Sequence, residues 1–249
     1  MTSEQMRLQR FLAQCGMGSR RKCEELIAQG AVSVNGDTVT TLGTKVKPQH
    51  DIVTVHGKVV RAAEPVLLLL YKPPGVVTTM HDPEGRRCIK DLLTPRYRSC
   101  FPVGRLDYES EGLVIVTNDG ELADLLLHPR YGVERTYRVL TEHRVPDPKL
   151  SKLEAGVRLP DGMAKARVLH VEDLQSGCWL ELSVREGRNR LVRRIMEAIG
   201  YPVRKLIRLQ HGPFRLGSLR PGELRKLSQQ ELLKVRRQLL QAVGQEEQQ

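Results

Sequence analysis

The chain has 249 residues and a formal net charge of +11 at pH 7, from 40 Lys and Arg residues against 29 Asp and Glu residues. A positive excess of this size favours a polyanionic partner such as nucleic acid, although it would also serve solubility alone. No apolar run reaches the roughly 18 residues needed to span a bilayer, and the first residues lack the apolar segment of a secretion signal. The composition therefore argues against a membrane protein and predicts a cytoplasmic one.

The 5 cysteines form no Cys-x-x-Cys pair, and no histidines lie at metal-ligand spacing beside them. An odd number of unclustered thiols indicates a reducing compartment, and we expect no structural metal. A chain of this length is also long for a single core, so two domains are expected.

Two short helices are predicted at the start of the chain. Residues 6–15 place apolar side chains at helical spacing and end at Gly16, a residue suited to terminating a helix. Ser19 is well placed to cap a second helix over residues 20–29, which is expected to stop at Gly30.

A hairpin and a further strand follow these helices. Asn35-Gly36 lies between two runs of strand-forming residues and is a strong hairpin signal, and residues 51–57 alternate between apolar and polar. This order of elements resembles the small S4 RNA-binding domain, with residues 19–22 and 34–36 as its specific part. We therefore predict an S4-type domain over residues 1–60.

The start of the second predicted helix is a candidate phosphate site, because free backbone N–H groups and three cationic side chains meet there. A solvated basic face is the alternative for the cluster, and a purely structural cap is the alternative for Ser19. The S4 resemblance favours phosphate contact. The RNA-binding residues predicted in this domain are Arg7, Ser19, Arg20, Arg21, Lys22 and Asn35.

Residues 61–66 are predicted to be a linker, followed by a second domain over residues 67–242 and a polar tail over 243–249. Strand-like runs recur in this second part without the regular strand–helix alternation of a doubly wound fold. We predict an α+β fold with a mainly antiparallel mixed sheet, closed by a helix whose capping box is Ser228 and Glu231. The predicted strands cover 66–72, 113–119, 135–141, 166–174 and 178–187, and the predicted helices cover 122–129, 148–156 and 189–200.

The most informative stretch is GRLDYESEGLVIVTNDG, residues 104–120. An Arg-Leu-Asp step ahead of a very apolar strand leaves Arg105 and Asp107 at the rim of the core. A nearby guanidinium keeps such a carboxylate ionised. A structural ion pair with Arg105 is one explanation of Asp107, and a chemical role is the other.

This stretch resembles the signature loop of the pseudouridine synthases that act on single uridines of ribosomal RNA. The shared pattern is GRLD, two variable residues, Ser or Thr, one variable residue, then Gly and an apolar strand ending in TNDG. The resemblance implies that Asp107 acts on the glycosidic site of a flipped-out uridine, by covalent attack or by removing a sugar proton. It implies that Arg105 helps to hold the base out, and that no cofactor is required, because no redox change or group donor is involved.

Other motifs resemble further parts of the same family. In Arg135-Thr136-Tyr137, the tyrosine is expected to stack on the uracil or exchange its protons, with an ordinary strand aromatic as the alternative. Lys72, in a strand leading into a Pro-Pro-Gly turn, could reach a phosphate, although the motif is chiefly turn chemistry.

The late segment EGRNRLVRRIMEAIGYPVRKLIR, residues 186–208, resembles a motif in which an arginine, here Arg193, partners the catalytic aspartate. Asn189 is expected to cap the helix that follows. The chain has Arg190-Leu191 where the family often has His-Gln, which puts substrate contacts in doubt but not the chemistry. The polar and basic residues of this segment are expected to contact the RNA backbone, with a solvated face as the alternative. The RNA contacts predicted here are Arg188, Asn189, Arg190, Arg194 and Arg208.

The leading hypothesis is a monomeric pseudouridine synthase that modifies one uridine in a stem-loop of 23S ribosomal RNA, in an assembling large subunit. The large-subunit preference rests on details such as LDYES and NRLVRR. A 16S target in the small subunit is the nearest alternative. A non-catalytic ribosome-assembly protein is another, against which the presence of Asp107, Tyr137 and Arg193 argues.

Overall fold

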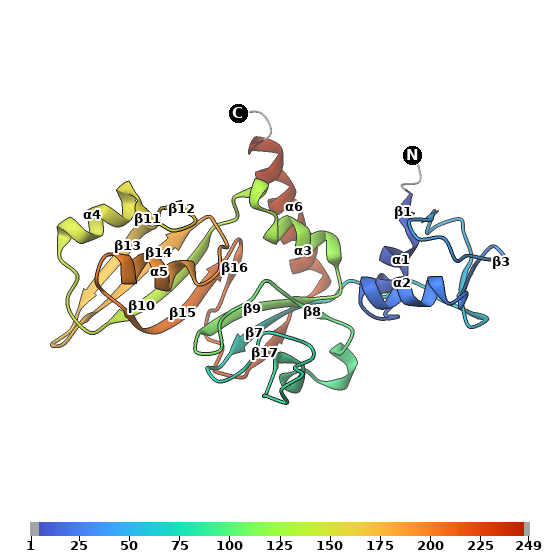
Figure 1. Cartoon of the computed structure of the whole chain (residues 1–249), viewed down its shortest axis with the longest axis horizontal. Coiled ribbons are helices and arrows are strands. Elements are labelled where there is room, and N and C mark those ends of the chain that lie inside the picture. The colour runs from blue at the N-terminus through green and yellow to red at the C-terminus, as the bar shows by residue number, and fades with distance from the viewer. Residues whose placement is uncertain (1–4, 247–249) are drawn as a thin grey trace. The chain divides into compact units, whose positions relative to one another are not determined.

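A small unit of two helices and short strands opens the computed structural model, which describes residues 5–246 (Figure 1). This unit contains the residues up to Val66 together with 118–120. Strands β3, β2, β5 and β6 form one antiparallel sheet in that order, and β1 pairs with β4. Its elements are β1 (Met6–Arg7), α1 (Leu8–Gln14), α2 (Arg20–Ala28), β2 (Val32–Val34), β3 (Asp37–Thr38), β4 (Lys45–Val46), β5 (Val53–Val55) and β6 (Lys58–Val59).

The predicted hairpin and second helix of this unit are confirmed. Asn35 and Gly36 have φ values of 53° and 96°, as a two-residue hairpin turn with both central residues at positive φ requires. Ser19 caps α2, because its hydroxyl accepts a hydrogen bond from the Lys22 backbone N–H at 3.2 Å. The first helix begins at Leu8, later than predicted, because the two residues before it pair with β4 instead.

The larger unit, residues 67–117 and 121 onward, is built on one mixed sheet (Figure 1). Its main strand order is β13-β14-β10-β15-β9-β7-β17, with β8 paired to β9 and β16 paired to β15. The pairings are antiparallel except that of β9 with β15, which is parallel.

Helices connect these strands and close the chain. The strands are β7 (Leu67–Lys72), β8 (Phe101–Val103), β9 (Glu111–Thr117), β10 (Arg135–Thr141), β11 (Val157–Leu159), β12 (Gly162–Ala164), β13 (Arg167–Asp173), β14 (Cys178–Val184), β15 (Val203–His211), β16 (Phe214–Arg215) and β17 (Leu224–Lys226). The α-helices are α3 (Gly120–Leu127), α4 (Asp147–Ala155), α5 (Leu191–Ala198) and α6 (Gln229–Glu246). The short 3₁₀ turns are η1 (Ile89–Leu92), η2 (Pro95–Tyr97) and η3 (Pro129–Tyr131).

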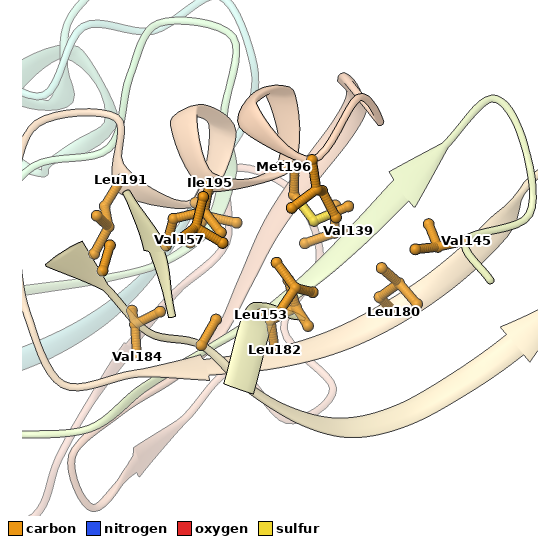
Figure 2. Close-up of a cluster of buried hydrophobic side chains, with 14 of the residues drawn as sticks. Val139, Val145, Leu153, Val157, Leu180, Leu182, Val184, Leu191, Ile195 and Met196 are labelled. Carbon is orange, nitrogen blue, oxygen red and sulfur yellow. The ribbon is translucent and has the colours of Figure 1, made fainter. Parts of the chain in front are cut away.

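The sheet has a separate core on each side of the β9–β15 pairing. In one core, Ile195 and Met196 of α5 pack against inward residues of β10 and β14 such as Leu180 (Figure 2). In the other, β7 and β9 pack against α3 and α6, with Ile115 and Leu122 fully buried. Strand alternation and the apolar stripe of α5 explain why these side chains point inward.

The predicted α+β class with a mainly antiparallel mixed sheet is confirmed. The capping box of α6 is also present, since the Ser228 N–H donates to Glu231 at 2.8 Å and the Glu231 N–H donates to Ser228 at 3.2 Å. That helix runs to Glu246, so the expected boundary at 242 falls inside it. The expected tail residues 247–249, and residues 1–4 of the expected S4-type domain, lie outside the described part of the chain.

Strand β15 was not anticipated as a strand, because its alternation is masked by closely spaced arginine and lysine residues. Within residues 5–246, no helix combines the length and the apolar character that crossing a membrane requires.

Gly112 permits the parallel contact between β9 and β15. Its φ is +105°, and a Cβ atom placed on it would lie 2.4 Å from the Arg208 carbonyl oxygen and 2.6 Å from the Arg208 nitrogen. Those atoms belong to the backbone and cannot rotate away. The glycine of the signature loop is therefore required where the two strands meet.

We expect Gly112→Ala to reduce the free energy of unfolding of the larger unit by at least about 3 kcal/mol, because a backbone clash adds to the cost of positive φ. Gly85→Ala is the matched control, since Gly85 has a φ of +71° and a Cβ atom added to it would meet no atom within 4 Å. It should lose only about 1–2 kcal/mol. Urea denaturation followed by the fluorescence of Trp179, the single tryptophan, measures both. Equal losses would contradict the clash.

Candidate active site

Asp107 lies in the loop between β8 and β9, and the residue before it anchors that loop. Leu106 is buried, its backbone N–H donates to the Thr78 hydroxyl at 3.1 Å, and its carbonyl accepts from the same hydroxyl at 2.6 Å. Ser110 closes the turn by donating its backbone N–H to the Asp107 carbonyl at 3.1 Å. The carboxylate is thereby held at the rim of the core, as the sequence predicts.

Two arginines flank the Asp107 carboxylate. Arg193 Nε lies 3.8 Å and Arg190 Nη1 lies 3.7 Å from Asp107 Oδ2. Both separations exceed a hydrogen bond, so the guanidiniums act on the carboxylate by charge while leaving its oxygens open to a substrate.

The Arg193 side chain is the more firmly fixed of the two. It is 11 % exposed, and it donates to the Ser110 hydroxyl at 3.3 Å and to the Val203 carbonyl at 3.2 Å. Burial lowers the pKa of this guanidinium, and neighbouring Arg190 acts in the same direction. The structure thus places Arg193 beside Asp107, as predicted, whereas Arg105 is exposed and lines the adjoining cavity.

Arg190, and not Asn189, is the N-cap of α5, which corrects the prediction. Arg190 has left-handed backbone angles of 49° and 29°, and no side-chain cap is present. The Asn189 carbonyl instead accepts a hydrogen bond from Arg194 at 3.2 Å. Left-handed arginine is unfavourable, and such residues cluster at functional sites. The departure from the family pattern at this position puts a second guanidinium beside Asp107.

A cavity of about 150 Å³ adjoins the carboxylate. A cavity of about this volume holds a single six-membered ring. Its walls include Asp107, the half-buried Tyr137 and apolar side chains such as Leu206. The site therefore combines an anionic group, an aromatic ring and room for one small ring.

Sequence comparison assigns this arrangement to a family. The family described as RNA pseudouridylate synthase matches residues 66–198, and the S4 domain family matches residues 6–53. The chain belongs to the RNA pseudouridine synthase family. The expectation of an isomerase with an S4 domain is confirmed, and RNA is the substrate class of this synthase.

Similar proteins cover nearly the whole synthase. The chain is 42% identical over 233 residues to "Ribosomal large subunit pseudouridine synthase B" of Bacillus subtilis, and the match covers 92% of this chain and 95% of that protein. It is 43% identical over 244 residues to an uncharacterized RNA pseudouridine synthase of Aquifex aeolicus, covering 96% of each. A crystal structure of a pseudouridylate synthase aligns with a TM-score of 0.65 at 28% identity, covering 92% of this chain and 99% of the other.

Lys72 anchors the signature loop of the synthase instead of reaching a phosphate. It is fully buried, and its ammonium group donates to the carbonyls of Ser110 at 2.7 Å, Pro73 at 2.9 Å and Tyr108 at 3.4 Å. Burial lowers the pKa of Lys72 to about 8, against the attraction of Asp107. The sequence motif was interpreted chiefly as a turn. No feature of the sequence indicates that Lys72 anchors the loop.

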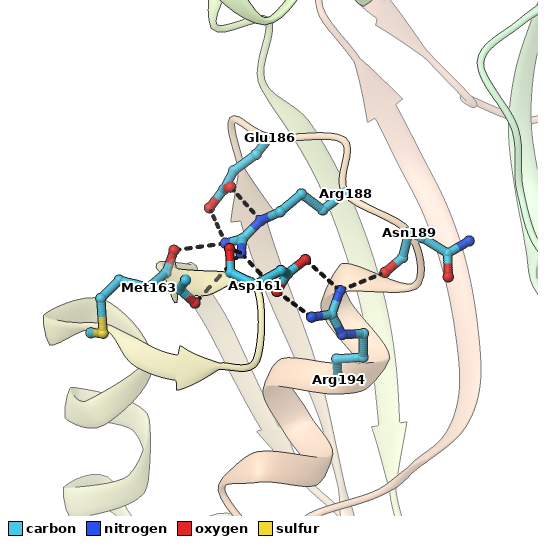
Figure 3. A network of polar contacts seen from close by, with 7 residues as sticks. Asp161, Met163, Glu186, Arg188, Asn189 and Arg194 are labelled. Carbon is cyan, nitrogen blue, oxygen red and sulfur yellow. Dashed lines mark hydrogen bonds and ion pairs between the residues drawn. The ribbon is translucent and has the colours of Figure 1, made fainter.

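Arg188 and Arg194 are held by carboxylates of the protein, so neither stands free as the predicted RNA contact (Figure 3). Arg188 Nη1 lies 3.1 Å from Asp161 Oδ1, and its Nε lies 2.8 Å from Glu186. Arg194 Nη1 donates to Asp161 Oδ2 at 3.0 Å, and this bond lowers the pKa of Asp161. The network fixes the loop that leads into α5.

Two further residues predicted to contact RNA also have partners within the protein. Arg208 is only 2% exposed, its Nε donates to the Leu113 carbonyl at 2.7 Å, and it lines the cavity. The Asn35 side chain accepts from Ile52 N–H at 2.9 Å and donates to Asp51 at 3.0 Å, which commits it to the hairpin. The four cations predicted to bind RNA in the S4 domain are all exposed, namely Arg7, Arg20, Arg21 and Lys22.

His211 is a cavity residue that the sequence did not reveal. It is fully buried, pairs across the strands with Arg135, and places its Nε2 3.1 Å from the Leu126 carbonyl. Burial lowers the pKa of His211 well below its usual value of 6.5, and Arg208 and Arg135 act in the same direction. Only the cross-strand register, which sequence does not supply, brings this side chain to the site.

The buried His211 makes stability depend on pH. Below the ordinary pKa of 6.5, His211 is protonated in the unfolded chain but stays neutral in the folded chain. The free energy of unfolding therefore falls as pH falls. We expect wild type to lose up to about 1.4 kcal/mol per pH unit in this range relative to His211→Gln. Urea denaturation between pH 7 and pH 5, followed by Trp179 fluorescence, measures the difference. A difference that does not change with pH would contradict a neutral His211.

Proposed function

We propose that this synthase converts one uridine of 23S ribosomal RNA in an assembling large subunit into pseudouridine, with Asp107 as the catalytic group. The observation that carries the proposal is the Asp107 carboxylate, held between two guanidiniums at the wall of a ring-sized cavity. The large-subunit target is supported by the name of the Bacillus subtilis relative, which covers almost the whole chain. A 16S target remains the alternative.

The reaction exchanges one bond for another within a single nucleotide. The bond from C1′ to N1 breaks, a bond from C1′ to C5 forms, and the proton that leaves C5 is balanced by one that arrives at N1. No electron acceptor or group donor is needed. Asp107 acts either as a nucleophile or as a base on the sugar.

The neighbouring residues bind and orient the uridine. Arg193 and Arg190 place two positive charges within 4 Å of the Asp107 carboxylate. Tyr137 supplies a ring on which the flipped base stacks. Arg105 is exposed beside the cavity, where it can occupy the space that the base leaves.

We expect Asp107→Asn to lower turnover by at least about 10³-fold, because the amide cannot act as nucleophile or base, while RNA affinity stays within several-fold. The measurement is a map of pseudouridine in total ribosomal RNA from a strain that lacks the gene and carries either form. Wild type should restore a missing 23S position and Asp107→Asn should not. Restoration by the variant would overturn the role of Asp107, and a missing 16S position would overturn the large-subunit target.

We further propose that the S4 domain holds the RNA backbone through the exposed cations at the start of α2, next to the Ser19 cap. Helix N-termini with adjacent cations bind phosphate groups by charge and by backbone donors.

Replacing Arg20, Arg21 and Lys22 together by Ala should flatten the slope of log affinity against log salt by about 2 to 3, because each lost phosphate contact releases fewer counterions. The control replaces Lys152, Arg158 and Lys165, which are exposed cations of the larger unit. It removes the same charge and should leave the slope nearly unchanged. Equal slopes for the two triple variants would show that net charge, and not this helix start, governs binding.

A further inference from the structure

The wall that β15 contributes to the cavity carries two buried polar atoms without partners. Arg208 is 2% exposed and His211 is 0% exposed, and both line the cavity together with Asp107. Within the described residues, Arg208 Nη2 and His211 Nδ1 have no hydrogen-bond partner. Leaving such atoms unsatisfied costs about 1–3 kcal/mol each, so a native structure that does so at a cavity wall is arranged for a ligand.

The hydrogen-bond roles of the two atoms follow from their neighbours. His211 Nε2 lies 3.1 Å from the Leu126 carbonyl, which can only accept, so Nε2 carries the proton. In the neutral ring, His211 Nδ1 is then an acceptor. Arg208 donates through Nε to the Leu113 carbonyl, and its Nη2 is a second donor. The wall therefore offers one acceptor and one donor.

Both groups are held rigidly. His211 lies opposite Arg135 in the pairing of β15 with β10, and Arg135 donates to the same Leu126 carbonyl at 3.0 Å. Arg208 lies opposite Gly112 in the pairing of β15 with β9. Groups fixed by two neighbouring strands do not rearrange to suit different ligands, which favours specific recognition.

One edge of uracil matches this pair. Its N3–H is a donor with a carbonyl on each side, whereas cytosine presents a bare acceptor nitrogen at the same position. The inference rests on the proposed uridine substrate. We propose that His211 Nδ1 accepts a hydrogen bond from N3–H of the flipped uracil, and that Arg208 Nη2 donates to an adjacent carbonyl of the same base.

This contact also suits the turning of the base within the site. To present C5 in place of N1, the ring rotates about the line through N3 and C6, which exchanges the carbonyls at C2 and C4. N3–H lies on that axis, so its bond to His211 persists while Arg208 meets one carbonyl before the rotation and the other after it. His211 and Arg208 are substrate-positioning residues that retain the detached base.

The experiment compares single-turnover rates at saturating enzyme on two RNA fragments that contain the mapped target, with uridine or 3-methyluridine at that position. Wild type should convert uridine at least about 100-fold faster than 3-methyluridine, because the methyl group replaces the N3–H donor and leaves the His211 acceptor unpaired. In His211→Ala, which removes the acceptor and makes room, uridine turnover should fall at least about 10-fold and the discrimination should shrink below about 10-fold. His170→Leu, at an exposed histidine of β13, is the matched control and should behave as wild type.

The outcomes separate the inference from the function on which it rests. Wild type that fails to convert uridine would overturn the proposed target. Wild type that converts 3-methyluridine as fast as uridine would overturn the inference, whether or not the variant folds. A cooperatively melting His211→Ala that retains the wild-type rate and discrimination would overturn it as well.

Discussion

The close approach of β9 and β15 at Gly112 is the constraint on which the site depends. The loop that carries Asp107 leads into β9, and the helix that carries Arg193 leads into β15. Pairing these two strands in parallel brings the carboxylate and the guanidinium together, although they lie far apart in sequence. A side chain at position 112 would strike the β15 backbone, so the relative position of the two halves of the sheet follows from one absent Cβ atom.

Around this seam the molecule buries several cations, each for a separate purpose. Lys72 donates to two carbonyls of the signature loop and to that of Pro73, Arg193 donates to Ser110 beside Asp107, and Arg208 donates to Leu113. Burial of a charge is unfavourable unless hydrogen bonds offset the lost hydration, and here backbone carbonyl groups accept most of those hydrogen bonds. The result is that the carboxylate proposed as the catalytic group lies beside cations fixed by the fold, which is the arrangement that electrostatic preorganisation requires.

Local patterns made much of the chain predictable. Hairpin chemistry at Asn35-Gly36, the cap at Ser19 and the capping box at Ser228 depend on neighbours within a few residues. The predictions that were wrong concern where a side chain finds its partner. Asn189 was expected to cap α5, yet its carbonyl accepts a hydrogen bond from Arg194. Arg208 was expected on an exposed basic face, yet it is buried at the cavity wall and donates to the Leu113 carbonyl.

The sequence by itself determined the α+β class and the motifs that carry Asp107, Tyr137 and Arg193, because these signals lie in short runs of residues. It also indicated two parts, and a different family matches each of them. Only the tertiary structure decided which basic residues are buried. Strand register sets that outcome, since a shift of one residue turns a side chain from the solvent to the core. Arg208 and His211 are therefore cavity residues because β15 pairs with β10 on one edge and with β9 on the other.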